Sequence, residues 1–221
     1  MQKFDTPAPI TVVLDVPAGL VRFIAADRAD SVVDVRPADP SKSRDVKAAE
    51  QVEIGYRDGL LRVTAAEPAN RLLGSSGSVE VTVQLPAGSR VEAKAAAGEI
   101  RGVGRLGDVA VEVALGPVKL DEAAGGRVVL QSGDVEIGRL TGPAEVSTRK
   151  GGIRIAEAVR GSLVLRTDLG AIEVGAAAGV SASLDAGTGH GRIHNALANA
   201  GETALHIQAT TAQGDITARS L

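Results

Sequence analysis

The segment VVLQSGDVEI (128–137) shows the pattern that decides the fold: an alternating apolar strand, a turn glycine, one variable residue, and a second strand that begins with Val or Ile. Near-copies of this pattern run from residue 90 to the end of the chain. Their turn glycines are Gly98, Gly116, Gly133, Gly151, Gly170, Gly191 and Gly214, with spacings of 18, 17, 18, 19, 21 and 23 residues. Seven copies at a nearly constant period indicate a repeat architecture.

Two strands that each alternate with a period of two cannot bury their apolar faces alone, whereas stacked copies can. The chain is therefore predicted to be an all-β solenoid with two-strand rungs of about 18 residues. The residue two positions after each turn glycine should form an interior ladder: Ile100, Val118, Val135, Ile153, Ile172, Ile193 and Ile216. A second ladder, two residues further on, is apolar in the middle and weaker at both ends: Gly102, Leu120, Ile137, Ile155, Val174, Asn195 and Ala218.

The residue between these two ladders should face solvent. It is charged in five copies and polar in the other two: Arg101, Lys119, Glu136, Arg154, Glu173, His194 and Thr217. From Lys119 to Glu173 successive members have opposite sign, and each exposed pair contributes only about 0.2–1 kcal/mol. We interpret the column as setting register and solubility, with a charged binding strip as the alternative.

The composition excludes several classes of function. The chain of 221 residues is 44% hydrophobic but 1% aromatic, with 27 Gly, no Trp and no Cys. It therefore cannot build an aromatic cage, a row of rings that stack on single-stranded nucleic acid, a disulfide or a cysteine zinc site. The net charge of −3 favours neither nucleic acid nor an anionic membrane. Without a signal peptide or an 18-residue apolar run, the sequence reads as cytoplasmic.

The sequence divides into a less regular part, residues 1–88, and the regular repeats, residues 89–221. We expect the first part to be the N-terminal portion of the same solenoid, with a small capping β-sandwich as the alternative. Asp58-Gly59 lies between alternating strands and predicts a hairpin. The polar segment 39–51 predicts a surface loop or a single helical turn.

Two other solenoids are disfavoured. A left-handed hexapeptide helix, typical of acyltransferases, needs an aliphatic residue at every sixth position, and the 17-residue rung breaks that phase. Strands such as VAVEVAL (109–115) also alternate for longer than a six-residue edge allows. The calcium-binding nonapeptide repeat needs GGxGxD runs, which the sequence lacks.

The chain resembles a bacterial β-strand-repeat family of unknown function that is often labelled "putative adhesin". The resemblance rests on VPAG (16–19), DGLLRV (58–63), SVEVTVQLPAGSRVEAK (78–94) and the glycine–acid–aliphatic turns, and it covers nearly the whole chain. It implies a right-handed single-chain β-solenoid without known catalytic residues. Some relatives lie at the cell envelope and some are linked to envelope-stress responses.

The three histidines, His190, His194 and His206, are the first candidate site because they all lie near the C-terminus. Residues four apart in a strand share a face but lie about 13 Å apart, too far for one metal ion. We interpret them as surface residues, and no metal site is predicted. The run GTGHGR (187–192) could cradle phosphate, but a strand follows it instead of the helix that such sites need, so no cofactor is predicted.

Acidic residues follow three of the turn glycines, at Glu99, Asp134 and Asp215. They do not form a continuous stack, so we expect them to serve the turns. With no aromatic subsites beside them, a polysaccharide-acting β-helix enzyme is the weakest hypothesis and no catalytic residue is predicted. Leu72-Leu73, in a polar segment, should pack over one end of the solenoid or contact a partner.

The function predicted from sequence is a non-catalytic structural or protein-interaction module that self-associates through its solenoid ends or binds a protein partner there. The rung that ends the chain, GDITARSL (214–221), is expected to present the free edge. A cytoplasmic regulator of an envelope-stress response that contacts a membrane or a membrane protein is the alternative. Neither a nucleic acid nor a small-molecule substrate is expected.

Overall fold

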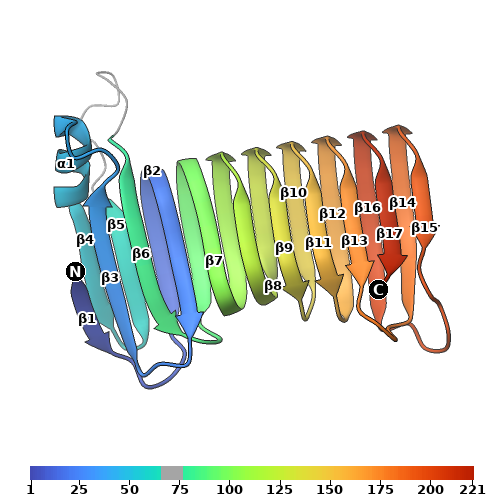
Figure 1. Cartoon of the computed structure of the whole chain (residues 1–221), viewed down its shortest axis with the longest axis horizontal. Helices are drawn as coiled ribbons and strands as arrows, with labels where there is room; N and C mark the ends of the chain where they lie inside the picture. Colours follow the sequence, from blue (N-terminus) through green and yellow to red (C-terminus); the bar gives the residue numbers. More distant parts are fainter. Residues whose placement is uncertain (66–76) are drawn as a thin grey trace.

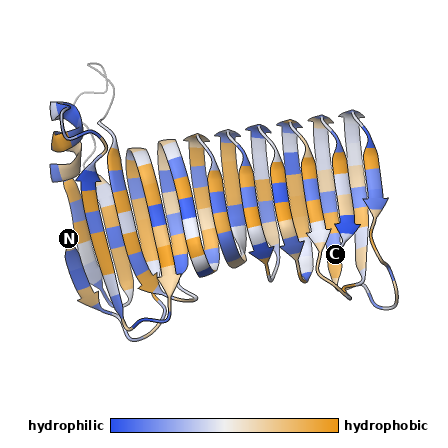
Figure 2. Cartoon of the chain, viewed as in Figure 1, coloured by the Kyte–Doolittle hydropathy of each residue, from blue (hydrophilic) through white to orange (hydrophobic). Residues whose placement is uncertain are grey.

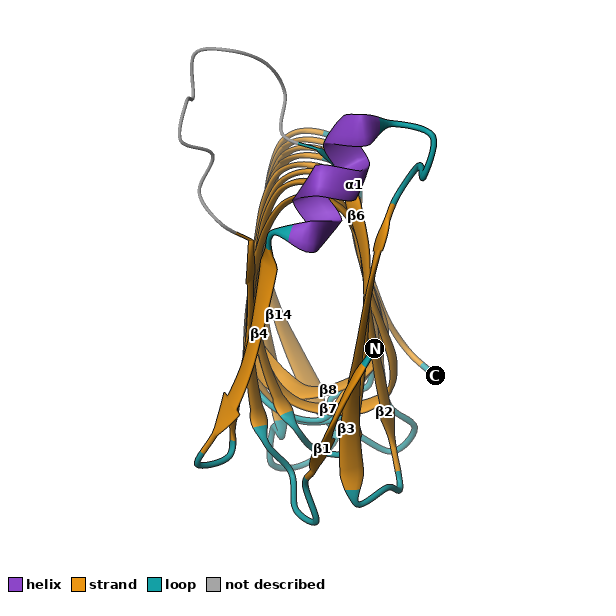
Figure 3. Cartoon of the chain, turned by 90° about the vertical axis from the view of Figure 1, so that its left-hand side faces the viewer, coloured by secondary structure: helices purple, strands orange, loops and turns teal. Residues whose placement is uncertain are grey.

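A computed structural model describes residues 1–65 and 77–221. These residues form one 17-stranded sheet and one helix. The sheet is coiled, so that it presents two opposed faces with the core between them (Figures 1 and 3). The elements are β1 (Gln2–Asp5), β2 (Thr11–Ala26), β3 (Asp30–Pro37), α1 (Ser43–Glu50), β4 (Val52–Arg57), β5 (Leu60–Ala65), β6 (Val79–Pro86), β7 (Arg90–Leu115), β8 (Val118–Ser132), β9 (Val135–Leu140), β10 (Ala144–Lys150), β11 (Ile153–Ala158), β12 (Gly161–Leu169), β13 (Ile172–Ala176), β14 (Ala182–His190), β15 (Ile193–Ala196), β16 (Leu205–Gln213) and β17 (Ile216–Ser220).

Each repeat contributes one strand to each face, and equivalent strands pair in parallel. We call the face with β10, β12, β16 and β14 face A, and the face with β9, β11, β13, β17 and β15 face B. On face B, Ile100 pairs with Val118, Val118 with Val135, and Ile153 with both Val135 and Ile172. This register confirms the predicted all-β solenoid, and the predicted interior ladder is buried at six of its seven positions, the exception being Ile193. Figure 2 shows the alternation of apolar and polar residues along the strands. The handedness of the coil stays a prediction.

The turn glycines form a column along one side of the solenoid, which explains why the repeats keep them. Gly151 has a φ of +142°, a conformation that side-chain-bearing residues rarely adopt. A Cβ added there would lie 2.1 Å from the carbonyl oxygen of Gly133 in the neighbouring rung. The strands can therefore approach to hydrogen-bonding distance at the turn only because neither residue has a side chain.

The N-terminal end of the solenoid is closed by elements outside the repeat. The strand β3 pairs antiparallel with β6 and β1, and β4 pairs antiparallel with β5 through the predicted Asp58-Gly59 hairpin. The helix α1 lies between the two faces at the upper part of this end (Figure 3). It has eight residues, more than the single turn that we allowed for the polar segment. The rings of Phe4 and Tyr56 lie 5.5 Å apart and pack against the core from its two faces.

The order of rungs in space differs from their order in the chain at both ends. The rung formed by β2 lies between β5 and β6 on one side and β7 on the other. The last rung of the chain, β16 and β17, lies between β12 and β13 on one side and β14 and β15 on the other. The expectation that segment 214–221 presents the free edge is therefore wrong.

The inner side chains explain why the last rung of the chain is inserted. In β17 the inward residues Ile216 and Ala218 are buried, as a rung covered on both sides requires. In β15 the residue in register with Ala218 is Asn195, an exposed polar residue that would need a partner if a further rung covered it. The rung with the less apolar interior lies at the end, where water can reach it.

Candidate functional site

The C-terminal end of the solenoid is the most distinctive surface of the described part of the chain. Within residues 1–65 and 77–221, β14 pairs only with β16, and β15 pairs only with β17. Both strands thus have one edge that no described strand covers, as do β1 and β4 at the other end, but the C-terminal pair has no described helix or aromatic ring beside it. Strand edges of this kind carry backbone N–H and C=O groups that can pair with another chain. We call the rung formed by β14 and β15 the open end.

Apolar side chains of the interior are uncovered at the open end. Ile193 is 46% exposed, whereas the six other members of its predicted ladder are no more than 1% exposed. On face A, Leu184 and Ala186 point toward the core but are only partly buried. An isolated exposed apolar residue needs no explanation, but here one exposed and two partly buried apolar side chains lie on the two strands whose edges are free.

Arg192 and Asp215 tie the turn of the open end to the rung beneath it. The backbone N–H of Arg192 donates to Asp215 Oδ1 at 2.9 Å, and Arg192 Nη2 donates to Asp215 Oδ2 at 2.8 Å. These hydrogen bonds lower the pKa of the Asp215 carboxyl and raise that of the guanidinium. The charge of Arg192 is therefore balanced within the chain and does not repel a partner at the open end.

Two of the three acidic residues that follow turn glycines, Asp134 and Asp215, accept hydrogen bonds from backbone N–H groups at a neighbouring turn. Asp134 Oδ1 accepts a hydrogen bond from the backbone N–H of Gly152 at 2.7 Å, in the same way that Asp215 serves Arg192. Glu99 lies within β7, in register with Leu20 of β2. The three acids are held in separate rungs and do not converge on one point.

A column of threonines beside the turn glycines was missed in the sequence. Thr167 Oγ1 donates to the carbonyl oxygen of Gly151 at 2.8 Å, and Thr148, Thr211 and Thr188 make the equivalent bond to a neighbouring turn glycine. Each lies three residues before its own turn glycine, a spacing that could have revealed it. Their hydroxyl groups satisfy glycine carbonyls, so the column stabilises the turns.

The structure places the three histidines apart. His206 Nδ1 lies 3.0 Å from Ser183 Oγ near the start of β16, whereas His190 pairs with Gln213 at its other end. Seven strand residues separate these two levels, about 23 Å. His194 lies on face B, beside Thr217. Among the described residues no cluster of three or more His, Cys, Asp or Glu could hold a metal ion.

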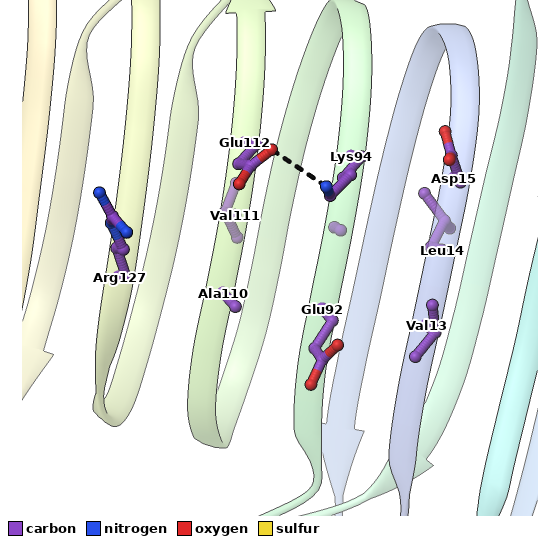
Figure 4. Close-up of a pocket in the computed structure, with 10 residues that line it drawn as sticks. Val13, Leu14, Asp15, Glu92, Lys94, Ala110, Val111, Glu112 and Arg127 are labelled. Atoms are coloured by element: carbon purple, nitrogen blue, oxygen red, sulfur yellow. Dashed lines mark ion pairs between the residues drawn. The ribbon is translucent and has the colours of Figure 1, made fainter.

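The outer faces carry alternating charges. On face B, Lys119 lies 3.6 Å from Glu136 and Arg154 lies 3.4 Å from Glu173, as the predicted column requires. On face A a shallow depression of about 370 Å³ crosses the β2, β7 and β8 rungs (Figure 4). It holds an ion pair between Lys94 and Glu112, 3.3 Å apart and more than half exposed. Exposed pairs of this type contribute little to stability.

The charged residues of the depression on face A are mostly paired along the sheet. Its charged residues are Asp15, Glu92, Lys94, Glu112 and Arg127. Four of the five form ion pairs along the sheet: Lys94 pairs with Glu112, Glu92 with Arg90, and Arg127 with Glu145. No serine, threonine or histidine lines the depression, so it offers no hydroxyl or imidazole to act as a nucleophile or base.

Leu72-Leu73, predicted to pack over one end of the solenoid or to contact a partner, falls outside the described residues. No helix in the described ranges is long and apolar enough to span a bilayer.

Comparisons with known proteins give one family and several similar folds. The family model described as "Toastrack DUF4097" matches residues 11–220. A "putative adhesin" from Bacteroides fragilis aligns with 98% of this chain and 95% of its own at 13% identity, with a TM-score of 0.53. At this identity the likeness shows the fold alone.

Two other solved structures align over similar lengths. A "putative cell adhesion protein" from Clostridium sporogenes covers 100% of this chain and 98% of its own, at 14% identity and a TM-score of 0.40. A "putative lipid binding protein" from Parabacteroides distasonis covers 98% and 95%, at 11% identity and a TM-score of 0.37. None of the curated proteins matches the chain.

Proposed function

Because the chain belongs to the Toastrack DUF4097 family, a family of bacterial β-solenoids of unknown function, we propose that it is a non-catalytic structural or protein-interaction module that binds through its open end. The observation that carries this proposal is the pair of uncovered strand edges, β14 and β15, with Ile193 exposed beside them. The sequence-based hypothesis of association through a solenoid end is thus kept, but at residues 182–196 instead of 214–221.

Natural sheets block their edges with very short edge strands, lysines, prolines, bulges and inward-pointing charges. Of these features the open end has only a short strand, the four-residue β15. The segments ASLDAGTGH of β14 and IHNA of β15 contain no lysine and no proline, and their inward residues are uncharged. An edge that is left accessible in both faces is suited to pair with another polypeptide, either a second copy or a different protein.

A pair of variants in β14 tests this proposal. Ala186→Lys places a charge on the inward side of the edge strand, where the free chain leaves it room to reach water. Gly187→Lys adds the same charge one residue later, at a position where a Cβ meets nothing within 4 Å. The wild type and the two variants are each immobilised, and the proteins that they retain are compared. We expect Ala186→Lys to retain none of the proteins that bind the wild type, and Gly187→Lys to retain all of them. Equal binding by both variants and the wild type would contradict the proposal.

Deleting the C-terminal rung is not an equivalent test. A chain that ends before Thr203 lacks β16 and β17, which hold β14 and β15 against the rest of the solenoid. Such a deletion removes an internal rung and uncovers the core. A loss of binding in the truncated chain could therefore be caused by unfolding of β14 and β15 instead of by loss of a binding surface.

The membrane-associated alternative rests on the family resemblance. Flotation with vesicles of anionic lipid at low salt tests it, and retention of the protein in the unbound fraction would remove direct lipid contact. The cytoplasmic location expected from the sequence stays a prediction, which fractionation of the source cells would test.

A further inference from the structure

The rung that ends the chain fills a slot between two earlier rungs, and the strands on both sides of this slot share one register. On face A, Leu163 of β12 pairs with Ile207 of β16, and Ile207 pairs with Leu184 of β14. The strands of face B, β13, β17 and β15, have a common register in the same way. If β16 and β17 left the slot, β14 and β15 would meet β12 and β13 with every inward ladder position matched.

Two arrangements of the C-terminal end therefore satisfy the strand pairing. In the inserted arrangement, which the structure shows, β16 and β17 lie beneath β14 and β15. In the in-order arrangement, β14 and β15 pair directly with β12 and β13, and β16 and β17 pair with the two edges that are free at the open end. We propose that the last rung exchanges between these two positions, so that the open end is a second docking site for β16 and β17 of the same chain.

The turn contacts between rungs are available in both arrangements. A Cβ on Gly214 would lie 1.9 Å from the carbonyl oxygen of Gly170, and one on Gly191 would lie 2.0 Å from that of Gly214. Because all three residues are glycines, Gly191 can approach Gly170 as closely as Gly214 does. Thr188 Oγ1 donates to the carbonyl oxygen of Gly214, and Thr211 Oγ1 makes the equivalent bond to the rung beneath it. Each threonine would meet a glycine carbonyl in either order of the rungs.

The connecting loops are long enough for both arrangements. Residues 141–143 and 159–160 each carry the chain forward by one rung, a step of about 4.8 Å, with three and two residues. The loop 177–181, which steps over two rungs from β13 to β14, has five residues, and the loop 197–204, which steps back from β15 to β16, has eight. In the in-order arrangement each of these longer loops steps forward by one rung only.

Two side chains favour the inserted arrangement. Asp215 accepts hydrogen bonds from the backbone N–H and the guanidinium of Arg192, and this contact exists only while β17 lies beneath β15. Asn195 is exposed at an interior ladder position at which Ala218 and Val174 are buried. In the in-order arrangement Asn195 would be enclosed between two rungs, where its amide would lose its contact with water. The in-order arrangement should therefore be the minor one, with roughly 0.1–10% of the molecules.

The exchange changes which strands lie at the tip of the solenoid. Ile193 lies there in the inserted arrangement, and Ile216 takes its place in the in-order arrangement. A protein that pairs with the free edges of β14 and β15 would compete with the chain's own last rung, and its binding would hold that rung in the slot. The inference does not rest on the proposed function, because the exchange needs no partner and is measured without one.

Pairs of introduced cysteines distinguish the two arrangements, since the sequence has no cysteine of its own. Val164→Cys with Gln208→Cys places the thiols on paired neighbours of the inserted arrangement. Val164→Cys with Asp185→Cys places them on two strands that β16 separates by about 9.6 Å in the structure. Because a disulfide needs Cα atoms within about 7 Å, this second pair can close only in the in-order arrangement.

The rates of disulfide formation in dilute solution measure the exchange, with oxidised glutathione as the acceptor of the two electrons. We expect the 164–208 pair to close within the monomer, and the 164–185 pair to close roughly 10- to 1000-fold more slowly, in proportion to the in-order fraction. Val129→Cys with Arg166→Cys is the control, because β10 separates these two residues in both arrangements. A 164–185 pair that closes no faster than this control would overturn the inference.

Interchanging the two side chains at one ladder position tests the cause of the preference. Asn195→Ala combined with Ala218→Asn moves the amide from the rung at the tip to the rung in the slot and leaves the composition unchanged. In this background the 164–185 pair should close at least about tenfold faster, because the in-order arrangement now keeps the amide in contact with water. An unchanged rate, in a protein whose circular dichroism spectrum is that of the wild type, would contradict the exchange.

Discussion

At its N-terminal end the solenoid ends in short antiparallel strands beside α1 and the Phe4–Tyr56 ring pair, whereas its C-terminal end stops at two strands of the parallel repeat that have no described helix or aromatic ring beside them. All three aromatic residues of the chain, the third being Phe23, lie in the first 56 residues. Repeats built from Val, Ile and Ala suffice for the body of the solenoid. Two of the rings, Phe4 and Tyr56, lie at the end of the interior, and the third, Phe23, is buried in the enclosed strand β2.

The two ends also share one feature. At each end the chain places a rung out of sequence order, so that β2 and the β16–β17 rung are both enclosed by other strands. The last residues of the chain are thus paired on both sides and are not left at the tip. The difference between the ends lies in what covers the outermost rung, and the variants below test that difference.

The largest effect is expected for Gly151→Ala in the body of the solenoid. The new Cβ would lie 2.1 Å from a backbone oxygen of Gly133, and no side-chain movement can relieve that contact. Together with the unfavourable φ of +142°, this should destabilise the protein by about 4 kcal/mol or more, measured by urea denaturation. Gly187→Ala at the open end, where a Cβ meets nothing within 4 Å, is the control and should change stability by less than about 0.5 kcal/mol. Similar losses in both variants would show that the open end is packed like the body.

An intermediate effect is expected for two isoleucines that occupy the same ladder position. Ile153 is 1% exposed and packs between two rungs, so Ile153→Ala should cost about 2–5 kcal/mol. Ile193 is 46% exposed because no described rung lies beyond it, and Ile193→Ala should cost less than about 1 kcal/mol in the monomer. The urea midpoints of the two variants measure the difference at low protein concentration. If Ile193→Ala were as damaging as Ile153→Ala, a further layer would have to cover the open end.

The smallest effect is expected at the closed end, from acid. Hydrogen bonds from Arg28 and Lys3 lower the pKa of Asp30 from 3.8 to about 2. Because the folded pKa is depressed, the stabilisation is present above pH 4 and is lost as the pH falls from about 4 to about 2. The urea midpoint of Asp30→Asn should therefore fall less steeply than that of the wild type as the pH drops through this window. Below the window the midpoints of the two proteins should be nearly equal. An unchanged pH profile in this variant would show that Asp30 does not stabilise the closed end.

The periodic positions in the sequence are sufficient to predict the body of the solenoid. The spacing of the turn glycines and the residue two positions later predicts the ladder from Ile100 to Ile172 and also Ile216, all of which are buried. Such predictions succeed because each rung meets another rung of the same kind. The Asp58-Gly59 hairpin is also predicted, since its two residues favour the required turn.

The order of the rungs could not be predicted from the period. Ile193 belongs to the ladder by position but is exposed, because its rung is the last in space although another follows it in the chain. The polar side chain of Asn195 indicated that its rung is poorly suited to lie between two others. A single polar residue does not show which later segment of the chain is inserted beneath that rung. Pairing between distant strands depends on the path of the connecting loops, and the repeat pattern contains no information about that path.

Amide hydrogen exchange tests most directly the claim that the open end is formed by residues 182–196. In dilute solution, peptides from β16 and β17 (205–220) should be strongly protected, because these strands are paired on both sides, and peptides from β14 and β15 should exchange much faster. Strong protection of 182–196 together with rapid exchange of 205–220 would place the last rung of the chain at the tip and contradict the account.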